Sequence, residues 1–265
     1  MSRNISDDLH PTEYKELLAI WQNQNFVPPQ IDYWYYMKFN PGLAKFLQQS
    51  PSVSWIFDLR HLRFDFVSKN SKEVLGYEPE LFKEKGLDFC NQIKHPEDLS
   101  RSWKLLKKVW EYIMEVPPAE REHYKFNYDY RNLKPNGEEV RILEQNAVLQ
   151  QDVNGNITHI LGICNDITGW KNTDNQIASI TSTKDDSIIF LMPDEPSQPL
   201  SQPILSKREI EIVSLLAQGY SSKQIADKLS ISFHTVNTHR QHMTQKTGVK
   251  NTGELVSFAI SNGLI

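Results

Sequence analysis

The 265-residue sequence contains only two cysteines, Cys90 and Cys164, which lie far apart along the chain. They have neither the spacing of a metal site nor that of a disulfide framework, as is usual in a reducing cytoplasm. No run approaches the roughly 18 apolar residues that span a bilayer. The polar first ten residues lack the apolar segment of a signal peptide. We therefore expect a cytoplasmic protein without a metal site.

Motifs of the common enzyme classes are also missing. The sequence has no Gly-x-Ser-x-Gly, no Gly-rich phosphate loop and no His-Glu-x-x-His. The pairs Asp7-Asp8 and Asp185-Asp186 lack the alternating β/α pattern that surrounds the acidic pocket of a phosphorylated receiver domain. We therefore expect a protein that is not an enzyme.

Positive charge is scarce overall but unevenly distributed. Residues 204–265 contain seven Lys/Arg and four Asp/Glu, a net charge of +3, and because the whole chain carries −4, the remainder carries −7. A small basic domain attached to an acidic remainder is typical of a DNA-binding protein, although a net charge of +3 is modest.

A proline-rich segment, Met192–Leu205, holds four prolines and reads as a linker, because proline fixes φ and removes a hydrogen-bond donor. We divide the chain into a helical and aromatic extension (1–50), an α+β domain (51–171), a hairpin with the linker (172–203) and a helical domain (204–265). The extension includes the aromatic run Tyr33–Met37. It either caps the core of the next domain or forms a dimer surface.

The second segment combines helices with short strands rich in aromatic and β-branched residues. Two of its turns contain Asn-Gly or Asn-Gly-Asn, which are typical of the turns in β-hairpins. This order predicts an α+β fold with a five-stranded antiparallel sheet. The expected strands are Ser54–Asp58, Arg63–Val67, Tyr124–Leu133, Glu138–Leu149 and Ile157–Asp166, with a long helix at Arg101–Glu115 and a separate hairpin at Gln176–Thr181 and Ser187–Met192.

This segment resembles a PAS domain over roughly residues 50–170. The residues that carry the resemblance are Phe66–Asn70, Leu75–Tyr77, His95–Asp98, Asn136-Gly137, Asp152–Asn156 and Gly162–Thr168. The resemblance implies a sensory domain that takes a small-molecule or protein signal and helps the chain to dimerise. His95–Asp98 is most simply a helix start whose acidic residues favour the helix dipole.

The sequence does not identify a cofactor for this domain. The residues around Cys90 do not match the motif of flavin-binding light sensors, and His123 is a lone histidine rather than a haem signature, so haem and flavin are disfavoured. Four aromatic residues are either plain core or the wall of a ligand cavity, and core is the simpler interpretation. They are Trp55, Phe57, Phe66 and Phe89.

Four helix starts follow in quick succession after residue 205. Ser206 with Glu209 forms a capping box, and Ser221 with Gln224 repeats it. Ser232 caps the third helix, and Asn251 with Glu254 caps the fourth. Because only residues 230–232 join the second and third helices, they must cross at a large angle, as in a helix-turn-helix. We expect a four-helix domain.

The third of these helices has an outward face of short polar and amide side chains. Asn and Gln can bind adenine edges in the major groove, and a threonine methyl group can contact thymine. Arg240, Lys223 and Lys246 are placed to neutralise phosphates, and the helix starts at Ser222 and Ser232 can offer backbone amides. The outward face consists of Thr235, Asn237, Thr238, Gln241 and His242.

The segment resembles the LuxR-type helix-turn-helix family over nearly its whole length. The matching stretches are Leu205–Glu209, Ala217–Gly219, Lys223–Ala226, Leu229–Ser232, Thr235–Arg240 and Lys246–Val249. The resemblance implies that Asn237, Thr238 and Gln241 face bases. It places Lys223, Thr235, His239 and Arg240 at the DNA backbone. Many members have lysine where this chain has Asn237, so a base preference does not carry over.

Together these features favour a transcription regulator that binds double-stranded DNA as a homodimer and whose PAS-like domain modulates binding. A different class remains open. In it, the chain is a protein-interaction adaptor whose last helices dock protein, which the modest +3 charge and the absence of lysine at position 237 favour.

Overall fold

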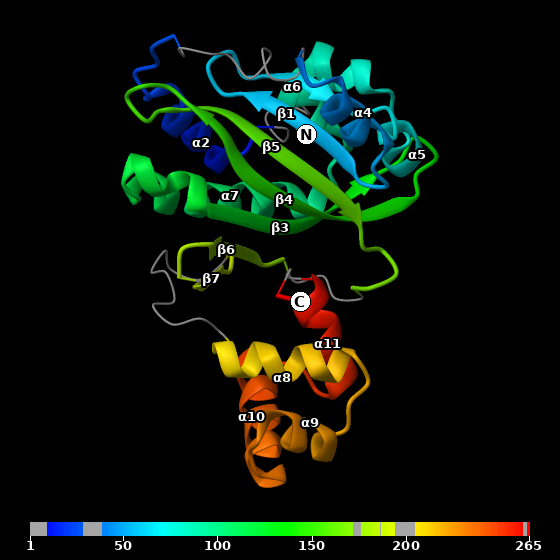
Figure 1. Cartoon of the computed structure of the whole chain (residues 1–265). Helices are drawn as coiled ribbons and strands as arrows, with labels where there is room; N and C mark the ends of the chain where they lie inside the picture. Colours follow the sequence, from blue (N-terminus) through cyan, green and yellow to red (C-terminus); the bar gives the residue numbers. More distant parts are fainter. Residues whose placement is uncertain (1–9, 29–38, 172–175, 186, 194–204, 262–263) are drawn as a thin grey trace.

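The computed structural model describes residues 10–28, 39–171, 176–185, 187–193, 205–261 and 264–265. Its N-terminal part is built on one antiparallel sheet with the strand order β2-β1-β5-β4-β3-β6-β7 (Figure 1). The strands are β1 (Val53–Asp58), β2 (Arg63–Val67), β3 (Tyr124–Leu133), β4 (Glu139–Gln151), β5 (Ile157–Asp166), β6 (Ala178–Ser182) and β7 (Ile188–Leu191).

The prediction of five strands was wrong, because the sheet has seven. The two additional strands are the hairpin expected after residue 175, and β6 pairs antiparallel with β3 from Tyr124↔Ser182 to Tyr128↔Ala178. Alternating apolar residues indicate a strand but do not say which sheet edge it joins. The free edge of β3 recruits the hairpin, which covers backbone groups that would otherwise stay unpaired.

Helices cover one face of the sheet and enclose the main core. They are α2 (Thr12–Gln22), α5 (Ser71–Leu75), α6 (Pro79–Ile93) and α7 (Pro96–Glu115), followed by the short η1 (Pro118–His123). His95 caps α7, and its Nδ1 accepts from the backbone N–H of Glu97 at 3.4 Å, which confirms a helix start at this point. The long helix begins at Pro96, five residues before the predicted Arg101, because Pro96 supplies the φ of a first helical residue.

The N-terminal extension packs on both faces of the sheet. On the helical face, α2 buries Tyr14, Leu17 and Trp21 in the main core, so this helix acts as a cap. On the opposite face, Leu47 of α4 (Pro41–Gln49) packs with Ile56 and other apolar side chains of the sheet. The aromatic run Tyr33–Met37 lies outside the described residues.

The C-terminal part is helical and has its own core. Its helices are α8 (Lys207–Ala217), α9 (Ser222–Leu229), α10 (Phe233–Thr247) and α11 (Thr252–Ser261). Most of the proline-rich linker lies outside the described residues. No helix in the described part of the chain is long and apolar enough to cross a membrane.

The β6–β7 hairpin forms the edge of the sheet that faces the C-terminal helices (Figure 1). Neighbouring residues of a strand point to opposite faces, and β7 uses both faces. Ile189 and Leu191 pack on the core of the sheet domain, whereas Ile188 and Phe190 pack on the core of the C-terminal helices. The rings of Phe190 and Phe258 of α11 lie 6.2 Å apart. The hairpin therefore belongs to both hydrophobic cores.

Candidate nucleic-acid interface and buried cavity

Side-chain caps define the helix-turn-helix unit at its helix starts. The predicted capping boxes at Ser206/Glu209 and Ser221/Gln224 are both present. Helix α9 ends at Leu229, and the left-handed backbone of the next residue, Ser230 (φ 53°), turns the chain away from the helix. Two residues later, Ser232 Oγ accepts from the backbone N–H of Thr235 at 3.0 Å and begins α10. These contacts are all local, and they set the angle between α9 and α10.

The register of α10 separates a buried side from a polar side. Val236 and Met243 are fully buried. Because successive helical residues are rotated by about 100°, Asn237, Thr238 and Gln241 fall on the side away from these two. Gln241 is exposed, and Asn237 and Thr238 are half-buried. The three side chains predicted to face bases thus share one outward surface of α10.

The basic residues predicted to contact phosphates differ in their surroundings. Lys223, in the first turn of α9, is exposed. Arg240 instead donates to Ser222 Oγ at 2.7 Å and to Thr252 Oγ1, so its guanidinium ties α10 to the starts of α9 and α11. Lys246 Nζ lies 2.7 Å from Glu209 Oε2. These contacts give Arg240 and Lys246 a structural role in addition to the predicted one.

Asn237, Arg240 and Gln241 also line an open hollow of about 360 Å³ between α10 and α11, together with Thr244, Lys250, Asn251, Thr252 and Leu255. Lys223, Ser232 and Thr235 lie outside it. His239 is half-buried on α10. The structure therefore brings three of the eight predicted site residues together around one polar depression and leaves the others beside it.

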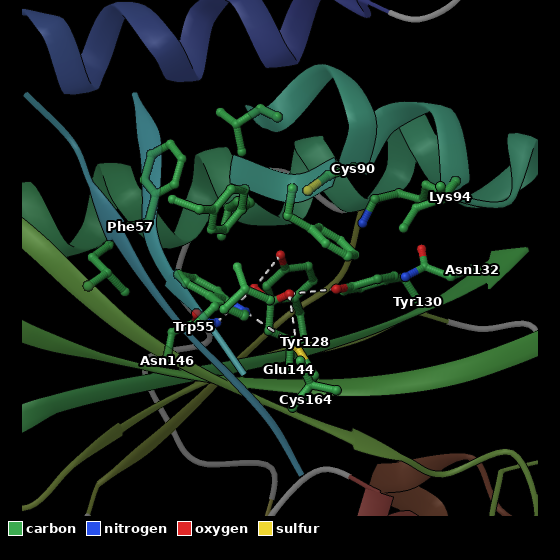
Figure 2. A pocket seen from close by; sticks show the side chains of 18 of the residues that line it. Trp55, Phe57, Cys90, Lys94, Tyr128, Tyr130, Asn132, Glu144, Asn146 and Cys164 are labelled. Atoms are coloured by element: carbon green, nitrogen blue, oxygen red, sulfur yellow. Dashed lines mark hydrogen bonds between the residues drawn. The ribbon is translucent and has the colours of Figure 1, made fainter. Parts of the chain in front are cut away.

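A second candidate site is a cavity of about 90 Å³ between the sheet and helices α2, α6 and α7 (Figure 2). Of the four aromatic residues considered from the sequence, Trp55 and Phe57 line it. Phe66 instead lies in a separate cluster with Leu47 and Ile56, and Phe89 packs against Phe82. The wall of this cavity is mostly aromatic and aliphatic.

A glycine in β5 makes room for one wall of the cavity. Trp55 lies opposite Gly162 in the β1–β5 pair. A Cβ at Gly162 would come within 2.1 Å of the Trp55 ring, so glycine at this position lets the indole lie this close to the strand. Trp55 Nε1 then donates to Cys164 Sγ at 3.4 Å.

One side of the cavity holds a buried carboxylate among hydroxyl donors. Glu144 accepts from Tyr128 Oη at 2.8 Å and from Tyr130 Oη at 2.5 Å, and Cys164 Sγ lies 3.8 Å from its Oε2. Burial, and then the nearby Glu144, raise the pKa of Tyr128 and Tyr130 well above the usual range of tyrosine. Both hydroxyls therefore stay protonated and keep donating to Glu144.

Lys94, at the end of α6, brings a cation to the same cavity. Burial lowers its pKa to about 8, against the opposing effect of Glu144. Its Nζ lies 3.2 Å from the centre of the Tyr130 ring, a cation–π contact. Nearby, burial raises the pKa of Cys90 to about 12, so this thiol stays protonated. His123 lies in η1 and does not line the cavity.

The sequence interpretation missed the polar residues Lys94, Asn132 and Glu144. A usable signal was present in the strands. Tyr128, Tyr130 and Asn132 recur at every second position of β3, so they share one face. That face points into the core, and polar side chains at such positions mark a buried polar site. Lys94, in contrast, follows a helix and carries no such signal.

Comparison with known proteins agrees with this architecture. Residues 64–164 match the model of the PAS fold, and residues 203–259 match that of bacterial regulatory proteins of the LuxR family. The oxygen regulatory protein NreC of Staphylococcus aureus (strain JH9) is 48% identical over 62 residues, which are 23% of this chain and 29% of that protein. The chain therefore spans less than a third of the length of the curated relatives it matches.

Two solved structures are among those to which the chain is similar. The PAS domain of a Colwellia psychrerythraea protein is 19% identical, with 49% of this chain and 98% of that chain covered and a TM-score of 0.39. The VqmA dimer of Vibrio cholerae is 17% identical, with 84% of this chain and 88% of that chain covered and a TM-score of 0.35.

Proposed function

We propose that this chain, which carries a PAS-fold domain followed by a LuxR-type helix-turn-helix domain, is a non-enzymatic transcription regulator of the cytoplasm. It binds a specific sequence of double-stranded DNA as a homodimer, and its PAS-fold domain modulates binding in response to a signal. The observation that carries the proposal is the polar outward surface of α10, which lies within the segment that matches the LuxR family.

The proposal assigns a role to each predicted site residue. Thr238, Gln241 and Asn237 contact base edges. The backbone phosphates are contacted by Lys223, Ser232, Thr235, His239 and Arg240. Because phosphate contacts release counterions, affinity falls steeply as salt rises. The division of the chain at residues 51, 172 and 204 is part of the proposal.

Selection of random duplex DNA by the purified full chain tests this function. We expect the wild type to enrich one motif with two-fold symmetry. The double variant Thr238→Ala/Gln241→Ala should lose it, because each base contact contributes about 1–3 kcal/mol of discrimination. Gln218→Ala, an exposed glutamine at the end of α8, is the matched control and should enrich the wild-type motif. Failure of the wild type to enrich any motif at low salt would contradict the proposal.

The adaptor alternative rests on the modest +3 charge of residues 204–265. It predicts a protein complex that survives high salt and that the double variant in α10 disrupts. A DNA motif lost by the same variant would exclude it.

A further inference from the structure

Two buried polar side chains, Asn132 and Lys94, lie at one end of the cavity, and one atom of Asn132 lacks a hydrogen-bond partner among the described residues. Asn132 is 5% exposed, and its Oδ1 accepts no hydrogen bond within the described part of the chain. Lys94 is 7% exposed, and its Nζ lies over the rings of Tyr130 and Tyr128. A buried polar group without a partner costs free energy, so this end of the cavity is suited to a ligand that supplies the missing bond.

The backbone places these two side chains next to each other. Lys94 and Asn132 form an isolated antiparallel bridge. Residues directly opposite in such a pair point to the same face, with Cβ atoms about 5 Å apart. Figure 2 shows both side chains at the same end of the cavity, beside Tyr130. One edge of a single small molecule can therefore reach both.

The charge balance of the cavity limits the ligand. Both oxygens of Glu144 accept hydrogen bonds, from Tyr128 and from Tyr130. The negative charge of Glu144 offsets the positive charge of Lys94. An anionic ligand would leave a buried net charge, which is costly in a low dielectric. The ligand should be neutral, and it should accept a hydrogen bond from Lys94 and donate one to Asn132.

Size and wall chemistry set the rest of the ligand. A volume of about 90 Å³ is roughly that of three waters in the liquid, so the ligand is limited to one small ring. The wall around it includes Trp55, Phe57, Trp103 and Trp110, which suits the faces and edges of an aromatic ring.

We propose that the cavity binds a neutral, single-ring aromatic molecule whose one edge presents an acceptor to Lys94 and an adjacent donor to Asn132, as an aromatic carboxamide does. This deepens the proposed function, on whose sensory domain it rests, by naming the chemical class of the signal.

The test uses three probes that share one benzene ring on the full chain without DNA: benzamide, benzoate of nearly the same shape, and the smaller, apolar toluene. Binding is measured by quenching of tryptophan fluorescence and by saturation-transfer NMR. We expect benzamide to bind about tenfold or more tightly than toluene, because it forms two buried hydrogen bonds, one from a charged donor. Benzoate should bind more weakly than benzamide.

Two variants separate the ligand contacts from the fold. Lys94→Met and Asn132→Leu should each reduce the preference for benzamide over toluene by about tenfold, while toluene still binds and so reports an intact cavity. The matched control is Lys83→Met, an exposed lysine on the same helix α6, which should leave the preference unchanged.

Three results would overturn the inference: benzoate binding best, toluene binding as tightly as benzamide, or no probe binding up to its solubility limit. Because these measurements omit DNA, they are independent of the selection experiment. Benzamide binding without an enriched DNA motif would refute only the proposed regulation, whereas a motif without benzamide binding would refute only the ligand class.

Discussion

The cavity of the PAS-fold domain and the outward surface of α10 present polar side chains under opposite conditions. In the cavity, Lys94, Asn132 and Glu144 are all less than 10% exposed. On α10, Gln241 is exposed to solvent and Asn237 is half-buried. A buried polar atom must find a partner, whereas water satisfies an exposed one.

This difference decides what counts as evidence for function in each region. Inside the cavity, a missing hydrogen bond is itself informative, as with Asn132 Oδ1. On α10, a missing bond carries no information, because water can supply it. The informative observation there is how the side chains are arranged relative to the buried Val236 and Met243. Four experiments test this comparison, from the largest expected effect to the smallest.

The largest effect is expected from Asp129→Ala in the interior of the sheet domain. The Asp129 carboxylate accepts from Arg141 at 2.6 Å and from Lys171 at 2.6 Å, and all three side chains are buried. Removing it takes the shared carboxylate away from two buried cations, at a cost of about 3–5 kcal/mol in the free energy of unfolding. Urea unfolding followed by tryptophan fluorescence measures this, since every tryptophan lies at or before position 170.

The exposed Asp227 of α9 is the control, and Asp227→Ala should change the free energy of unfolding by less than about 0.5 kcal/mol, measured by circular dichroism. If Asp129→Ala cost no more than Asp227→Ala, burial would not distinguish the two regions as we argue.

The next effect concerns the hairpin between the regions. Phe190 is 1% exposed and packs on the C-terminal core, so Phe190→Ala should cost about 3 kcal/mol. It should also separate the two regions in unfolding. Fluorescence, which follows the tryptophan-containing part, and circular dichroism, which follows both parts, should give different midpoints. Phe233→Ala, at a 49% exposed position, should leave the midpoints where they are in wild type. Coinciding midpoints in Phe190→Ala would show that the hairpin does not couple the regions.

A smaller, pH-dependent effect is expected at Glu209 in α8. Burial would raise the pKa of its carboxyl group, but Lys246 and the backbone and hydroxyl of Ser206 outweigh burial and hold the pKa below its usual range. Such a group stabilises the fold at pH values above its unfolded pKa, about 4.3, and the stabilisation is lost as the pH falls through the lower folded-state pKa.

We therefore expect Glu209→Gln to be about 1 kcal/mol less stable than wild type at pH 7. This difference in the free energy of unfolding should shrink as the pH falls toward 3. Urea unfolding followed by circular dichroism at both pH values measures it. If the difference in the free energy of unfolding stayed constant with pH, the lower stability of Glu209→Gln would come from packing rather than from charge.

The smallest effect is expected at the exposed Lys223. Lys223→Ala should weaken binding to all DNA sequences alike and reduce the slope of log K against log salt by about 0.9, the contribution of one phosphate contact. Binding titrations at several salt concentrations measure it. Lys83→Ala, on α6 of the other domain, is the control and should keep the wild-type slope. A change in sequence preference instead would place Lys223 at a base.

Local features of the fold were predictable, and long-range ones were not. The capping boxes at Ser206 and Ser221 and the helix start at His95 were identified from residues within one helical turn. The attachment of β6 to β3 was missed, because strand periodicity carries no information about the partner edge. Helix α6 was also not identified, and its backbone at Gly86 (φ 58°) interrupts the regular helical pattern.

The candidate sites divide in the same way. The sequence by itself determined that α10 has a polar outer surface, since helical spacing alone separates Asn237 and Gln241 from the buried Val236. Only the tertiary structure decided that Lys94 and Asn132 meet at one end of a cavity, opposite a carboxylate held by two tyrosines. The physical reason is the separation along the sequence. The surface of a helix follows from neighbours three or four residues away, whereas a cavity is enclosed by side chains that distant segments bring together.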